Sequence, residues 1–243
     1  MVGAAYEGSE PGRVVGVIGA CGGAGASVVA ACLAHGLRRT GERATLVDLD
    51  AHGPGLQLLL GNDGARGARW PDLAEARGDV DGAGLVAALP RWGVVPVVSG
   101  TASGPPPDDD VVLDVCRGLV RSGETLVLDL PRPGAHGPAV RTLLAGCTTV
   151  LVVVPLTLRA AVGARRLHHA LGEAGTSDVR LVGRAPAPGA VDDGEIEAGL
   201  GLPVVATMPR DERLARAVEA GAGPAVSSRS RLGRFAGDLA SAL

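Results

Sequence analysis

Residues Gly19–Ser27, with the sequence GACGGAGAS, decide the fold of this chain. An apolar run typical of a buried strand, Val14–Ile18, comes before them, and an apolar stretch typical of a helix, Val28–Leu37, follows. A glycine-rich loop between a strand and a helix points backbone N–H groups and the helix dipole at an anion. The stretch therefore predicts a phosphate-binding loop, and a plain tight turn is the alternative interpretation of its glycines.

The loop lacks the lysine that a working phosphate loop places just before its Ser or Thr to reach the β- and γ-phosphates. That position is Ala26, and the whole chain contains no lysine, since all 23 basic residues are arginines. The sequence therefore indicates a site that can hold phosphate but lacks the group that contributes most to hydrolysis.

Composition bounds the class of this 243-residue protein. Hydrophobic residues make up 46% of the chain and aromatic residues only 2%, which predicts one domain with a core of Val, Leu and Ala. The net charge of −3 gives no reason to expect specific binding to nucleic acid. Four scattered cysteines are typical of reduced thiols, and no apolar run reaches the roughly 18 residues of a membrane span. We therefore expect a cytoplasmic protein.

Apolar strands and amphipathic helices alternate along the chain, which predicts an α/β fold: a mostly parallel twisted sheet with helices on both faces. Residues 61–92 are expected to be irregular. Strands are predicted at 13–19, 44–48, 94–99, 125–130, 148–154, 179–183 and 204–208. Helices are predicted at 26–39, 56–60, 111–121, 138–145, 158–174, 193–199, 211–220 and 231–243.

Three carboxylates follow predicted strands at the edge where ligands of such sheets bind. Asp48 and Asp50 end the second strand, and Asp129 ends the strand 125–130. A carboxylate after an apolar strand is the Walker B pattern, which holds Mg²⁺ beside a nucleotide. The alternative is an aspartate that only caps a helix or a turn. The presence of the glycine loop favours the nucleotide site.

A dinucleotide-binding dehydrogenase is the competing class. The spacing of Gly19, Gly23 and Gly25 matches the fingerprint of short-chain dehydrogenases. That class needs a Tyr-x-x-x-Lys pair, whereas the single tyrosine here is Tyr6 and lysine is absent. The stricter Gly-x-Gly-x-x-Gly pattern also fails, because position 28 is Val.

In their order along the chain, these motifs resemble the deviant-Walker P-loop family that includes MinD, ParA and the CpaE/TadZ proteins. The family loop reads Lys-Gly-Gly-x-Gly-Lys-Ser/Thr, where this chain has Cys21–Ser27. Val47–Asp50, Val127–Pro131 and Met208–Arg213 resemble the family's later motifs. The resemblance implies a SIMIBI-type P-loop NTPase domain over residues 13–243. Residues 1–12 are expected to form a disordered leader.

Within this family the chain resembles the CpaE-like branch, called septum site-determining proteins and encoded near secretion and pilus genes. Two segments carry that likeness, Arg69–Leu73 and Gly183–Gly189. Longer members of the branch have a receiver-like N-terminal domain, which we do not expect within these 243 residues. The resemblance implies a bacterial cytoplasmic protein, recruited to a pole or septum, that positions division or Tad pilus and secretion machinery.

The resemblance also assigns roles at the site. ATP or ADP with Mg²⁺ is the implied cofactor, bound weakly or not at all, and Asp50 is the implied water-orienting catalytic residue. The implied Mg²⁺ site is Ser27, Asp48 and Asp129. The implied nucleotide-binding residues are Cys21, Gly22, Gly23, Ala24, Gly25, Ala26, Ser27, Val28, Pro209 and Asp211.

Both family lysines are absent. The lysine that reaches the partner's phosphates across a dimer is replaced by Cys21, and the lysine that holds the β- and γ-phosphates is replaced by Ala26. We therefore expect a weak nucleotide binder or pseudo-ATPase scaffold more than an enzyme. The alternatives are a slow ATPase in which Arg132, Arg210 or Arg213 supplies the missing charge, and a nucleotide-free interaction module.

The family also implies a homodimer and protein partners from the division or pilus machinery. At the C-terminus, Leu232, Phe235, Leu239 and Leu243 have helical spacing among arginines. Such a stripe either contacts a membrane, as the last helix of MinD does, or packs on the sheet; the second is favoured here. Trp70 and Trp92 are expected to anchor the core or a loop.

Overall fold

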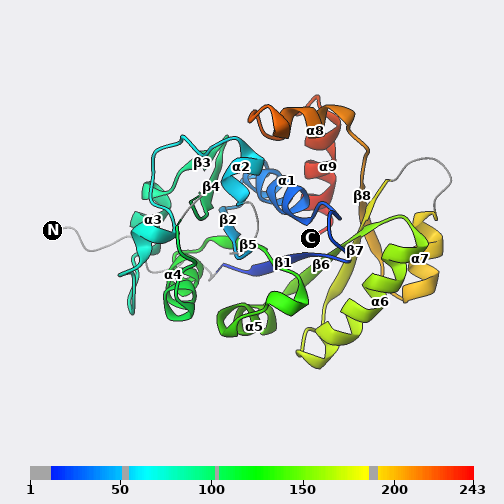
Figure 1. Ribbon diagram of the computed structural model, residues 1–243, viewed down its shortest axis with the longest axis horizontal. Coiled ribbons are helices and arrows are strands. Elements are labelled where there is room, and N and C mark those ends of the chain that lie inside the picture. Colours follow the sequence, from blue (N-terminus) through cyan, green and yellow to red (C-terminus); the bar gives the residue numbers. More distant parts are fainter. Residues whose placement is uncertain (1–11, 51–54, 102–103, 186–190) are drawn as a thin grey trace.

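The computed structural model describes residues 12–50, 55–101, 104–185 and 191–243. The predicted leader therefore lies outside the described residues except for Gly12, and so does part of the segment 183–189. Eight strands form one sheet in the order β3-β4-β2-β5-β1-β6-β7-β8 (Figure 1). The strands are β1 (Val14–Gly19), β2 (Ala44–Asp48), β3 (Arg91–Trp92), β4 (Val95–Val98), β5 (Thr125–Asp129), β6 (Thr149–Pro155), β7 (Val179–Arg184) and β8 (Val204–Met208).

The sheet is mostly parallel, as the sequence predicts. Every pairing is parallel except that of β3 with β4, which is antiparallel. The helices are α1 (Ala26–Arg39), α2 (Leu56–Leu60), α3 (Gly82–Ala88), α4 (Asp109–Arg121), α5 (Pro138–Ala145), α6 (Leu158–Glu173), α7 (Asp193–Leu200), α8 (Glu212–Glu219) and α9 (Arg231–Ser241).

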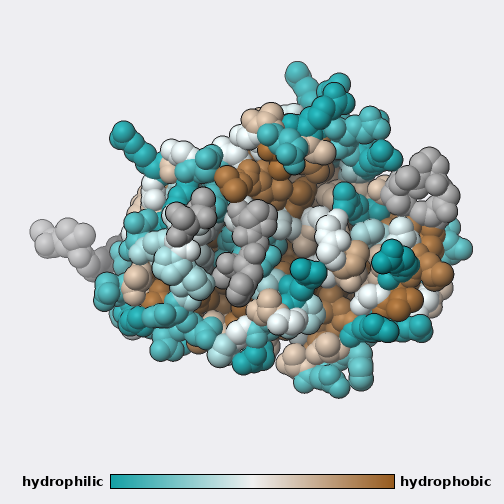
Figure 2. Space-filling model, viewed as in Figure 1, coloured by the Kyte–Doolittle hydropathy of each residue, from teal (hydrophilic) through white to brown (hydrophobic). Residues whose placement is uncertain are grey.

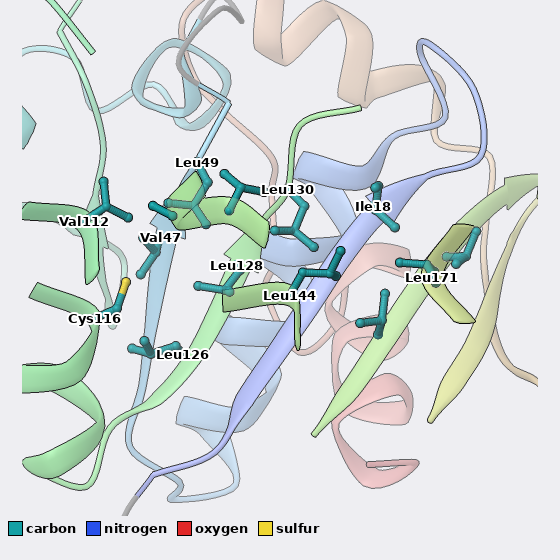
Figure 3. Close-up of a cluster of buried hydrophobic side chains, with 14 of the residues drawn as sticks. Ile18, Val47, Leu49, Val112, Cys116, Leu126, Leu128, Leu130, Leu144 and Leu171 are labelled. Atoms are coloured by element: carbon teal, nitrogen blue, oxygen red, sulfur yellow. The ribbon is translucent and has the colours of Figure 1, made fainter. Parts of the chain in front are cut away.

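Two hydrophobic cores lie on opposite faces of the sheet, because successive residues of a strand point to opposite sides. In β5, Leu126 and Leu128 join the core under α4, α5 and α6, part of which Figure 3 shows, while Val127 joins the core under α1 and α9. Continuous apolar strands thus supply both cores at once. This double burial is why the strands read as unbroken apolar runs rather than as alternating ones.

The expectation that residues 61–92 are irregular is wrong. This stretch contains a 3₁₀ turn (η1, Trp70–Leu73), the helix α3 and the short strand β3. Helix α3 has the sequence GAGLVAA, whose glycines give a weak helical signal. Its start is fixed by Asp81, which accepts hydrogen bonds from the N–H groups of Ala83 and Gly84. The cap and the packing of α3 on α4 outweigh the poor propensity.

The C-terminal apolar stripe packs inside the protein, as favoured from the sequence. Leu232, Phe235 and Leu239 of α9 are buried in the core shared with α1. Leu158 and Val162 of α6 are large hydrophobic residues that are 74% and 40% exposed. Figure 2 shows apolar surface at the upper centre and at the right of the molecule. In the described part of the chain, every helix is too short or too polar to cross a membrane.

Helices α1 and α9 pack backbone to backbone at Gly36, where an added Cβ would lie 2.0 Å from the carbonyl oxygen of Ala236. We expect Gly36→Ala to lower the free energy of unfolding by about 1–3 kcal/mol, because the two helices must separate. On the open side of α9, nothing lies within 4 Å of a Cβ added at Gly237. Gly237→Ala should therefore raise stability by about 0.5–1 kcal/mol. Denaturant unfolding measures both, and equal effects would contradict the close contact.

Candidate phosphate-binding site

The glycine loop joins β1 to α1 in the conformation that an anion site needs. Gly23 and Gly25 have φ angles of 72° and 93°, a region that residues with a Cβ avoid. Gly25 is the N-cap of α1, and no side chain accepts a hydrogen bond there. The first N–H groups of α1 therefore have no capping side chain in the described structure and are available to a ligand.

Asp48 and Asp129 lie side by side at the same edge of the sheet. They are register partners on β2 and β5, and only 7% and 4% of their surfaces are exposed. Burial raises the pKa of Asp129 to about 8, and the neighbouring Asp48 carboxylate adds to the effect. Burial likewise raises the pKa of Asp48 to about 6. A cation beside these two buried acids would favour their ionised forms and so lower both pKa values.

The two aspartates differ in their partners. The carboxylate of Asp48 accepts hydrogen bonds from the backbone N–H groups of Asp50 and Leu56, at 3.1 and 2.9 Å, so it also holds the first residue of α2. At Asp129, only a hydrogen bond with the Ser27 side chain lowers the pKa. Asp48 is thus partly a structural residue, whereas Asp129 faces the loop with little to balance its charge.

A cavity of about 420 Å³ gathers these groups. It brings together every residue predicted for the loop, the predicted Mg²⁺ ligands and Asp50. The cavity is lined by Gly19, Cys21, Gly22, Gly23, Ala24, Gly25, Ala26, Ser27, Val28, Asp48, Asp50, Gly55, Leu56, Leu59, Asp129, Leu130, Arg132 and Arg184. The loop and the acids predicted from the sequence therefore lie around one cavity.

Pro209 and Asp211 lie in a neighbouring depression of about 540 Å³, which shares Arg184 with the loop cavity. The Asp211 side chain accepts a hydrogen bond from the N–H of Arg213 and so caps α8. These two predicted nucleotide-binding residues therefore stand beside the loop cavity and not in its wall.

The structure separates the arginines that the sequence could not rank. Arg132 lines the loop cavity, whereas Arg210 and Arg213 line other depressions. Arg184, which the sequence analysis missed, also lines the cavity and donates a hydrogen bond to the carbonyl oxygen of Gly23. Its signal was its place as the last residue of an apolar strand, because parallel strands end at the ligand edge of the sheet.

A second cavity, of about 450 Å³, adjoins the first through Asp48, Asp50 and Gly55. Apolar residues dominate its wall, among them Trp70, Val112 and Val140. The indole N–H of Trp70 donates to the backbone carbonyl of Asp48 at 2.9 Å. Trp70 and Trp92 are both buried, so the expectation that they are anchors is confirmed.

The residues present fit a magnesium nucleotide. In the described ranges, no group of three or more His, Cys, Asp and Glu side chains could hold a metal ion alone. Mg²⁺ commonly needs only one or two carboxylates, and it completes its shell with water and phosphate oxygens. Ser27, Asp48 and Asp129 fit that incomplete set, and the loop N–H groups fit the phosphates.

Solved structures of known proteins share this architecture. The ParA family ATPase of Chlorobium tepidum matches with a TM-score of 0.78 at 18% identity, over 96% of this chain and 99% of that one. The cell division ATPase MinD of Pyrococcus furiosus matches with a TM-score of 0.76 at 20% identity, over 95% and 98%. The chain has the ParA/MinD P-loop NTPase fold.

Sequence comparisons agree with the ParA/MinD fold at the loop. The ParA model, described as NUBPL iron-transfer P-loop NTPase, matches residues 11–74, which include the loop and Asp48. An uncharacterized protein of Mycobacterium tuberculosis is 39% identical over 213 residues, which are 86% of this chain and 58% of that protein. The chain thus spans little more than half the length of this relative.

The raised pKa of Asp129 predicts how stability of the nucleotide-free ParA/MinD fold depends on pH. Between its ordinary pKa of 3.8 and about 8, the folded chain keeps a proton that the unfolded chain has released. Stability should therefore fall as the pH rises through that window. Asp129→Asn should remove much of this fall and raise the midpoint of thermal unfolding at pH 8.

Asp178 provides the matched control for this measurement. The Arg180 side chain lowers the pKa of the Asp178 carboxyl, so its ionised form stabilises the folded chain. Asp178→Asn should lower the midpoint at pH 8, opposite to the effect at Asp129. A pH profile that Asp129→Asn leaves unchanged would contradict the assignment.

Proposed function

We propose that this protein is a ParA/MinD-type P-loop protein that binds ATP or ADP with Mg²⁺ weakly and acts as a scaffold more than as an enzyme. One observation carries the proposal: the loop, Ser27 and the two buried aspartates meet around one cavity that contains no lysine. The backbone cradle for phosphate is present, and so are the oxygens for Mg²⁺. At the lysine positions of the loop stand Cys21 and Ala26.

The size of the missing interactions supports weak binding. A hydrogen bond from a charged group contributes about 1.5–3 kcal/mol, so two absent lysines correspond to roughly a hundredfold or more in affinity. The cost to hydrolysis is larger, because charge stabilisation in the transition state changes rates by orders of magnitude. Mg²⁺, when bound, neutralises phosphate charge, and Asp50 is the residue we assign to orient water.

A role in spatial organisation is our proposal for the cell. It rests on the likeness to MinD and ParA, and for the CpaE-like branch on the segments quoted above. One solved neighbour is titled as a complex of MinC with MinD from Aquifex aeolicus. By analogy, we propose that this chain forms a homodimer and binds a protein of the division or pilus machinery. Recruitment of a cytoplasmic pool to a pole or septum completes the proposal.

Fluorescence microscopy of a tagged protein tests the cellular role. We expect a focus or band at a pole or septum, and a division or pilus defect in a deletion strain. A uniform signal together with normal division and normal pili would contradict it.

A slow, genuine ATPase is the second candidate, favoured by the position of Arg132 in the cavity wall. Steady-state ATP hydrolysis separates the two candidates. Turnover by the native protein that falls in Arg132→Gln would support the enzyme. No turnover at all would support the scaffold.

Calorimetric titration with Mg-ATP and Mg-ADP tests the binding site itself. We expect weak, magnesium-dependent binding by the native protein and tighter binding by Ala26→Lys, because the new ammonium group reaches the phosphates. Ala26→Gln is the matched control, since it adds length without charge. If the native protein and Ala26→Lys both fail to bind while remaining folded, the loop is not a nucleotide site, and the nucleotide-free interaction module becomes the better proposal.

A further inference from the structure

Two arginines approach the glycine loop from different parts of the sheet. Arg132 lies three residues after Asp129, and its Nη1 is 3.5 Å from where a Cβ on Gly22 would lie. Arg184 ends β7, and its Nη1 is 3.7 Å from where a Cβ on Gly25 would lie. The two guanidinium groups therefore stand over two points of the loop that are three residues apart.

Neither guanidinium is neutralised by a carboxylate within the described part of the chain, where ion pairs do form elsewhere. Arg38 and Arg43, for example, both pair with the buried Glu124. Arg184 instead donates to the Gly23 carbonyl, a neutral acceptor within the loop. An arginine without an anionic partner, placed beside backbone N–H groups that also favour anions, is suited to bind a phosphate.

The charges in the cavity are arranged by strand. The acids end β2 and β5, whereas Arg184 ends β7, which the sheet order separates from β5 by β1 and β6. A metal ion at the acids and phosphates at the loop would then each meet the opposite charge. Arg132 follows the strand that ends at Asp129, and it lines the cavity together with Asp129 and Gly22.

We propose that Arg132 and Arg184 together supply the positive charge that two loop lysines supply in the family, both from within one chain. This inference rests on the proposed nucleotide site. Arg184 also positions the loop through Gly23 before any ligand binds. An arginine can bind a phosphate with two parallel N–H bonds, so a guanidinium outside the loop can replace an ammonium group inside it. The lysine-free loop then keeps part of its affinity for phosphate through guanidinium groups that lie outside it.

The experiment is calorimetry on the full chain with Mg-ADP, Mg-ATP and adenosine as probes. Arg132→Gln and Arg184→Gln should each weaken Mg-ADP binding about 10- to 100-fold, as expected for a lost charge-assisted hydrogen bond. The double variant should show no measurable binding, and Ala26→Lys added to it should restore binding. Any affinity for adenosine alone should stay unchanged, because adenosine carries no phosphate.

Arg213→Gln is the matched control, because Arg213 lies on the same edge of the fold but outside the loop cavity. It should bind Mg-ADP as the native protein does. Both cavity arginines are at least partly exposed, and thermal unfolding without nucleotide checks that each variant is folded.

The possible results separate the two proposals. Native binding that stays within twofold in Arg132→Gln, Arg184→Gln and the double variant would overturn the arginine assignment and leave the nucleotide site standing. The arginine assignment would also be overturned if Arg213→Gln lost as much affinity for Mg-ADP as Arg132→Gln and Arg184→Gln do. A general loss of positive charge would then explain the effect. A native chain that binds neither nucleotide would overturn both proposals.

Discussion

The parallel pairing of β2, β5 and β1 is the constraint on which the rest of the structure depends. It sets Asp48 opposite Asp129 and brings Gly19, at the end of β1, to the same edge. Both aspartates are buried there, so their carboxylates are costly to ionise without a cation. The fold accepts that cost at an edge where the N-terminus of α1, which has no capping side chain, lines the same cavity as the two acids.

The arginines that line this cavity come from outside the glycine loop. Cys21 and Ala26 of the loop carry no positive charge, and Arg132 and Arg184 line the same cavity from two other elements. A cation on a separate element moves when that element moves. If phosphate binds here as we propose, we expect its affinity to depend on how β5 and β7 and the residues that follow them are held.

Several parts of this arrangement were predictable because they are local. The hydrophobic pattern predicted α1, β2 and β5, and the glycine spacing predicted the loop. The aspartates were predicted from their places after apolar strands. Each of these patterns lies within a few residues of the chain. Helix α3 was missed because its sequence has weak helical propensity. The local cap at Asp81 and the tertiary packing on α4 together outweigh that propensity. Arg184 was missed because its local signal, the end of an apolar strand, does not reveal contact with a loop that lies 161 residues away.

By itself, the sequence determined the class of fold, because the hydrophobic pattern of strands and helices is visible along the chain. It also determined that no lysine can stand in the loop, because residue identity does not depend on the fold. It could not rank Arg132, Arg210 and Arg213, which all follow apolar strands near the ligand edge. Only the tertiary structure placed Arg132 and Arg184 in the loop cavity and the other two outside it. The physical reason is that electrostatic partnership depends on distance in space, and the order of strands in the sheet, not their order in the chain, fixes that distance.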